Sequence, residues 1–131
     1  MIFIYLFEKD DRYIHTIKPL FHQIETHKIS GVTSTVSVIE TLSPPKYQKD
    51  AHLNSEISRF FQETPGLMVY PVSWEISLEA ARLRRTYPRL RTPDAIQLAT
   101  AIITKADIFF TNDAKIKTLS IPDIKISFPG P

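Results

Sequence analysis

The chain has 131 residues and a formal charge of +2 at pH 7, from 16 Lys and Arg against 14 Asp and Glu. This length fits one domain, which we place over residues 1–131. The absence of Cys excludes a disulfide scaffold and thiolate metal sites, and the small net charge excludes a bulk polycation that coats nucleic acid. Residues 1–7 are apolar, but they are too few for a membrane span and lack the flanks of a signal peptide. We therefore expect a cytoplasmic protein.

Short apolar segments alternate with helical patterns along the chain. The first, residues 1–9, fits either a buried strand or a short helix. Further helices are expected over residues 13–27, 35–42, 47–63 and 73–86 and after residue 92, and strands over residues 29–33, 67–70, 108–111 and 124–128. Ser73 and Thr92 are expected to cap their helices, with Pro93 in the first helical position. This alternation predicts an α/β fold whose parallel sheet is covered on both faces, with functional groups at the carboxyl ends of its strands.

Three carboxylates stand where such a fold gathers its functional groups. Asp113 directly follows the strand at 108–111, Asp94 lies in the first turn of its helix, and Glu40 interrupts an apolar helical stretch. Each has a simpler interpretation, because Asn-Asp often forms turns, an acid favours a helix start, and Glu40 can face solvent. The small side chains at 95, 99, 100 and 101 would let the helix approach the sheet closely and bring Asp94 to the edge that holds Asp113.

Carboxylates that converge from separate elements repel one another, and a divalent cation relieves that repulsion. Oxygen ligands without His or Cys suit Mg²⁺ or Mn²⁺. Such ions activate water and hold phosphoryl oxygens, so the pattern indicates phosphodiester hydrolysis.

Basic residues surround these acids in the sequence. Five of the seven Arg residues lie within positions 82–91, which lead into Asp94, and Lys115 follows Asp113. They could position a polyanionic backbone through phosphate contacts. The alternative is a solvated helix face whose basic last turn stabilises the helix.

These motifs together resemble the PIN-domain ribonucleases. The resemblance rests on residues 80–84 and 91–101, on the Thr111-Asn112-Asp113 turn after residues 107–110, and on residues 32–40, which resemble the second acidic motif of the family. It covers nearly the whole chain in the right order and is strongest for the compact VapC-type toxins of prokaryotic toxin–antitoxin pairs. It implies a PIN-like three-layer α/β/α fold around a mainly parallel central sheet.

The resemblance implies a metal-dependent endoribonuclease. Glu40, Asp94 and Asp113 match the acidic residues that bind Mg²⁺ or Mn²⁺ and act in catalysis. The residues that would shape the site around them are Ser34, Thr111 and Asn112. The side chains expected to contact RNA are Arg84, Arg85, Arg89, Arg91 and Lys115. Toxins of this kind form homodimers and are silenced by a cognate antitoxin that occupies the active groove.

The N-terminus departs from the family pattern. The family begins with a buried strand that ends in Asp and leads into an apolar helix, and residues 2–8 match that helix. The strand and its Asp are then missing, and Asp10 and Asp11 are poor substitutes because they follow the apolar segment. We weigh three explanations: a shortened chain whose true start lies upstream, a decayed gene copy, or residues 2–7 in the place of the strand with Glu8 or Asp10 near the site.

Loss of one of four carboxylates would weaken metal binding and catalysis. The alternative function is therefore a catalytically inactive PIN-like module that binds an antitoxin or RNA without cleavage. A flavodoxin-like signalling domain would explain the alternating elements and an acidic edge. It would not explain the Arg-rich stretch that leads into Pro93 and Asp94.

Overall fold

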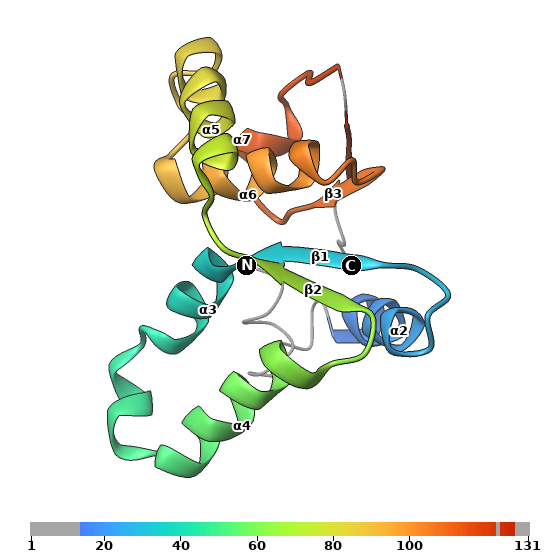
Figure 1. The fold of residues 1–131 in the computed structure, drawn as a ribbon, viewed down its shortest axis with the longest axis vertical. Helices are drawn as coiled ribbons and strands as arrows, with labels where there is room; N and C mark the ends of the chain where they lie inside the picture. The colour runs from blue at the N-terminus through green and yellow to red at the C-terminus, as the bar shows by residue number, and fades with distance from the viewer. Residues whose placement is uncertain (1–13, 123, 128–131) are drawn as a thin grey trace.

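The computed structural model describes residues 14–122 and 124–127 (Figure 1). In chain order its elements are α2 (Ile14–Glu25), β1 (Gly31–Ser34), α3 (Thr35–Leu42), the 3-10 helix η1 (Pro45–Lys49), α4 (Ala51–Glu63), β2 (Leu67–Tyr70), α5 (Trp74–Thr86), α6 (Thr92–Ile103), β3 (Ile108–Phe110), α7 (Ala114–Lys117) and β4 (Lys125–Ser127). The element that we expected over residues 1–9 lies outside the described residues. Within the described ranges, no helix combines the length and the apolar character that crossing a membrane requires.

The four described strands form two separate parallel pairs. In the first pair Val32 of β1 lies opposite Met68 of β2, and in the second Phe109 of β3 lies opposite Ile126 of β4. The parallel pairing that the alternating pattern predicts is therefore confirmed. Over residues 14–122 and 124–127, β1 pairs with β2 and β3 pairs with β4, so the described strands form two sheets.

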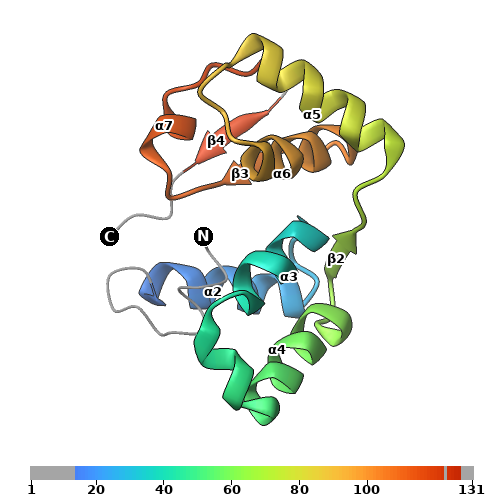
Figure 2. The ribbon, with the colours of Figure 1, turned by 90° about the vertical axis from the view of Figure 1, so that its left-hand side faces the viewer.

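Each strand pair has its own hydrophobic core, and Figure 2 shows the corresponding two halves of the molecule. The core beside β1 and β2 is formed by Ile17, Phe21, Ile24, Tyr47, Ile57, Phe61 and Leu67. The core beside β3 and β4 is formed by Ile76, Ala80, Leu83, Leu90, Ala95, Leu98, Ala99, Ala101, Ile116, Ile121 and Ile124. Helix α6 contacts α5 and both β1 and β3, so it spans the two halves.

The small residues that follow Asp94 explain this position of α6. Ala95 and Ala99 have no exposed surface, and Thr100 and Ala101 are also buried. Side chains of this size let a helix approach its neighbours closely. Helix α6 accordingly packs against both β1 and β3.

Two helix starts differ from the sequence prediction. The helix expected over residues 47–63 is divided, because Asp50 ends η1 and accepts a hydrogen bond from the backbone N–H of Leu53, which starts α4. Thr92 is the first residue of α6 rather than its cap, since the carbonyl of Arg91 accepts the first helical hydrogen bond from Ala95. Ser73 caps α5 as predicted, accepting from the N–H of Ile76 over 3.1 Å.

Candidate functional site

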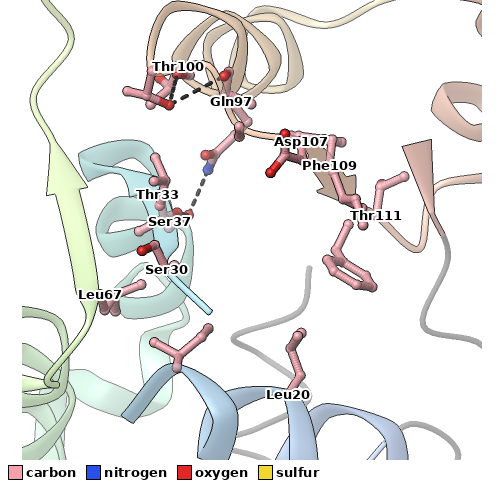
Figure 3. Close-up of a pocket in the computed structure, with 18 of the residues that line it drawn as sticks. Leu20, Ser30, Thr33, Ser37, Leu67, Gln97, Thr100, Asp107, Phe109 and Thr111 are labelled. Carbon is pink, nitrogen blue, oxygen red and sulfur yellow. Dashed lines mark hydrogen bonds between the residues drawn. The ribbon is translucent and has the colours of Figure 1, made fainter. Parts of the chain in front are cut away.

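A cavity of about 510 Å³ lies between the two strand pairs (Figure 3). Its walls come from α2 and β1 on one side and from α6, β3 and the turn after β3 on the other. In Figure 3, Ser30 and Thr33 lie across the cavity from Phe109 and Thr111. The cavity therefore separates β1 from β3.

All three predicted carboxylates line this cavity. Glu40 comes from α3, Asp94 from the first turn of α6, and Asp113 from the turn that follows β3. All three side chains are half-buried. Tertiary structure thus brings to one cavity three acids that lie far apart in the sequence.

The pKa values show that these carboxylates influence one another. Burial raises the pKa of Glu40, and the negative charge of Asp94 raises it further. Burial likewise raises the pKa of Asp94, with a further contribution from Asp113, while the guanidinium of Arg91 acts in the opposite direction. Asp94 is therefore the central member of the three, since it interacts with both of the others.

The chemistry of these donors fits a hard divalent cation, but their arrangement does not form a complete metal site. Carboxylate oxygens are the ligands that Mg²⁺ and Mn²⁺ prefer, and a cation would relieve the repulsion that raises the pKa values. Over residues 14–122 and 124–127, however, no three Asp, Glu, His or Cys residues converge closely enough to hold a metal ion.

The turn after β3 has a defined hydrogen-bond pattern. The buried Thr111 accepts a hydrogen bond at Oγ1 from the backbone N–H of Asp113 over 3.1 Å. Asp113 in turn accepts one at Oδ1 from the N–H of Lys115 over 2.8 Å and caps α7. One oxygen of Asp113 is thus engaged, and Asn112 lines the cavity beside it.

Ser34 has a different position from the other predicted site-shaping residues. It is fully buried and caps α3, accepting at Oγ from the N–H of Val36 over 3.2 Å. Its neighbour Thr33 lines the cavity, whereas Ser34 is not part of the lining. Ser34 therefore affects the site indirectly, because it caps the helix that carries Glu40.

The predicted RNA-contacting residues lie outside the cavity lining. Arg91 is close enough to Asp94 to lower its pKa, whereas Arg84 donates from Nε to the carbonyl of Leu90 over 3.2 Å. All of the predicted RNA-contacting side chains are exposed: Arg84, Arg85, Arg89, Arg91 and Lys115. Arg91 is therefore the one whose position links the basic stretch to the acids.

The sequence interpretation missed a polar cluster in the same cavity. Gln97 donates from Nε2 to Oγ of Ser37 over 2.7 Å, and Ser37 shares a hydrogen bond of 2.7 Å with Thr33 (Figure 3). Gln97 follows Asp94 by three positions and Ser37 precedes Glu40 by three. Residues three apart lie on the same helix face, so this spacing was the available signal.

Comparison with known proteins gives the same fold. The PIN domain matches residues 1–121, and no curated protein sequence matches the chain significantly. The chain is similar to one in the crystal structure of VapBC2 from Rickettsia felis bound to a DNA fragment from its promoter. Their TM-score is 0.68 at 18% identity, over 97% of this chain and 92% of that one. Since the family match extends over most of its length, this chain belongs to the PIN domain family.

Proposed function

We propose that this protein is a metal-dependent endoribonuclease of the VapC toxin type. The observation that carries the proposal is the electrostatic coupling of Asp94 to both Glu40 and Asp113 at one cavity. Half-buried carboxylates that repel one another are costly unless a cation or a proton neutralises them. Membership of the PIN domain family supports the same conclusion.

In this proposal Glu40, Asp94 and Asp113 bind Mg²⁺ or Mn²⁺. A bound ion of this kind supplies an activated water and neutralises charge on the phosphate. Thr111 orients Asp113, because its Oγ1 accepts a hydrogen bond from the backbone N–H of Asp113. Arg91 places a positive charge beside Asp94.

The basic residues are proposed to contact the RNA backbone. Arg85 and Arg89 are exposed near the end of α5 and in the loop that leads into α6. Phosphate contacts of this type position a strand without reading its sequence. RNA is therefore the proposed substrate, bound across the acidic edge.

We also propose a cognate antitoxin as protein partner and a homodimer as the working form, both in the cytoplasm. The similar structure from Rickettsia felis is a VapBC2 complex bound to a promoter fragment. The antitoxin proposal rests on that likeness and on the PIN domain match.

A second candidate is a PIN module that binds RNA or an antitoxin without cleavage. The observation that favours it is that, in the part of the chain that the structure describes, three acids do not converge on one metal position.

The test is RNA cleavage by the full chain with Mn²⁺, with Mg²⁺ and with EDTA, comparing Asp94→Asn with Asp50→Asn. Both substitutions replace a carboxylate near a helix start, but Asp50 is exposed and caps α4 outside the cavity lining. We expect metal-dependent cleavage that Asp94→Asn reduces at least about 100-fold and Asp50→Asn leaves unchanged. Equal cleavage by both variants would contradict the proposal, and RNA binding without any turnover would favour the inactive module.

A further inference from the structure

Gln97 is hydrogen-bonded to the helix that carries Glu40. Its Nε2 donates to Oγ of Ser37 over 2.7 Å (Figure 3). Gln97 follows Asp94 by three positions on α6. Ser37 precedes Glu40 by three positions on α3, and all four residues line the cavity. Because residues three apart share a helix face, the hydrogen bond joins the two faces that present the acids.

Ser37 is also held from a second side. Its Oγ shares a hydrogen bond of 2.7 Å with Oγ1 of Thr33 on β1, and both residues are buried. The polar cluster thus runs from α6 through α3 to β1. A hydrogen bond between such groups requires heavy atoms about 2.7–3.2 Å apart in a favourable direction. It therefore restricts the spacing of these elements more narrowly than an apolar contact does.

Helices α3 and α6 belong to different hydrophobic cores. Val38 of α3 packs against the core beside β1 and β2, whereas Leu98 of α6 is buried in the core beside β3 and β4. In the part of the chain that the structure describes, Gln97 and Ser37 form the only hydrogen bond between a side chain of α3 and one of α6. This bond is therefore the directional contact between the two helices.

The charges at the cavity act against a close approach of these helices. Burial raises the pKa of Glu40, and the negative charge of Asp94 raises it further. When both carboxylates are ionised they repel each other, which favours a larger distance between α3 and α6. The bond to Ser37 opposes such a movement, because its loss would leave a buried hydroxyl with one partner fewer.

We propose that Gln97 is a positioning residue whose hydrogen bond to Ser37 fixes the separation of α3 and α6. It thereby fixes the separation of the carboxylates of Glu40 and Asp94. Its effect on metal binding rests on the proposed function, whereas its effect on helix spacing concerns the fold alone. Ligands must be held within about 0.5 Å of the productive geometry, so loss of the bond should weaken metal binding although both acids remain.

The distance between the two helices provides the first test. The native sequence contains no Cys, so nitroxide spin labels can be attached to introduced Cys residues. Ile39→Cys and Thr92→Cys place the labels at exposed positions of α3 and of the first turn of α6. Pulsed EPR measures their distance distribution in the absence of metal and RNA. Gln97→Met is compared with the unsubstituted background, because it keeps a side chain of similar length and removes the donor.

We expect Gln97→Met to shift or broaden the distance distribution by at least about 1 Å. Gln62→Met, at an exposed position of α4, is the matched control and should leave the distribution unchanged. An unchanged distribution in Gln97→Met would overturn the proposal.

Mn²⁺ affinity separates positioning from a general contribution to stability. The triple variant Thr33→Val, Ser37→Ala, Gln97→Met replaces the whole polar cluster with apolar groups of similar shape. Replacing all partners of buried hydrogen bonds in this way is nearly neutral, so its Tm should stay within about 2 °C of the native value. Its affinity for Mn²⁺, measured from the EPR signal of the free ion, should nevertheless be about 10-fold weaker.

Native Mn²⁺ affinity in the triple variant would overturn the proposal, because the bond would then contribute to stability alone. Absence of Mn²⁺ binding by the native protein would instead contradict the proposed metal-dependent function. The spin-label distances require no metal, so in that case they still decide whether Gln97 sets the spacing of α3 and α6.

Discussion

Gln97 of α6 and Ser37 of α3, 60 positions apart, are joined by a hydrogen bond of 2.7 Å from Nε2 to Oγ. Helix α6 contributes to the core beside β3, whereas α3 directly follows β1. The bond therefore links the two halves of the molecule across the cavity. Because Ser37 also bonds with Thr33, the polar cluster extends from α6 to the strand edge.

Replacing Gln97 by Ala should lower the free energy of unfolding by about 1 kcal/mol, because it leaves the buried Ser37 with one partner fewer. The measurement is urea denaturation of Gln97→Ala, Ser37→Ala and the double variant. The double variant should lose less than the sum of the two single losses, since both remove the same bond. Gln62→Ala, at an exposed position of α4, is the control and should change stability by less than about 0.5 kcal/mol. Additive losses would show that the two side chains are not coupled.

The raised pKa values of Glu40 and Asp94 predict a pH-dependent stability. In the unfolded chain these carboxyls ionise near pH 4, so above that pH the folded state binds more protons than the unfolded state. The stability that comes from these protonated carboxyls is fully present below the unfolded pKa values. It is lost as the pH rises through the raised pKa values of the folded state. Glu40→Gln combined with Asp94→Asn should thus raise Tm by about 1–3 °C at pH 7 and leave it unchanged near pH 3.

Divalent metal should reverse the difference in Tm between the native protein and the double variant Glu40→Gln, Asp94→Asn. Mn²⁺ at pH 7 should raise the Tm of the native protein and not that of the double variant, because binding to the folded state alone stabilises it. Glu25→Gln with Asp50→Asn is the matched control, since both residues are exposed outside the cavity lining, and it should respond to Mn²⁺ as the native protein does. An equal response of the double variant would place the metal elsewhere.

Gly66 is predicted to tolerate no side chain. Its φ of 78° lies in the left-handed region, and a Cβ there would collide with the backbone carbonyl oxygen of Ile24. We expect Gly66→Ala to lower the free energy of unfolding by more than about 2 kcal/mol. Gly31→Ala should cost less, because its Cβ would meet the movable Cδ1 of Ile24 at 2.8 Å. Urea denaturation of both variants measures the difference, and equal losses would contradict this explanation.

Arg89 is expected to contribute to RNA binding through phosphate contact. Arg89→Ala should weaken binding of a single-stranded RNA and reduce the slope of log K against log salt by about 0.7. Arg59→Ala is the control, because Arg59 lies exposed on α4 and pairs with Glu63 over 3.9 Å. Fluorescence anisotropy over a range of salt concentrations measures both. An equal decrease for the two variants would indicate a general charge effect rather than a basic RNA-binding surface.

The local elements were largely predictable, because periodicity and capping act within a few residues. The pattern of residues 35–42 gave the bounds of α3, and Ser73 marked the start of α5 correctly. The prediction of a single helix over residues 47–63 was wrong. The pattern did not show that the side chain of Asp50 would accept a hydrogen bond from the backbone N–H of Leu53 and start a new helix there. Thr92 was predicted to cap α6, but the cap is Arg91, one residue earlier.

The sequence alone identified the family motifs, the parallel pairing and the three acids, since each depends on residue type and short spacing. The site roles of Glu40, Asp94 and Asp113 stay predictions. Tertiary structure alone decided that these acids share a cavity and that Gln97 reaches Ser37. It also decided that β1 and β3 stand apart with their edges toward that cavity, because pairing between distant segments depends on how whole elements pack.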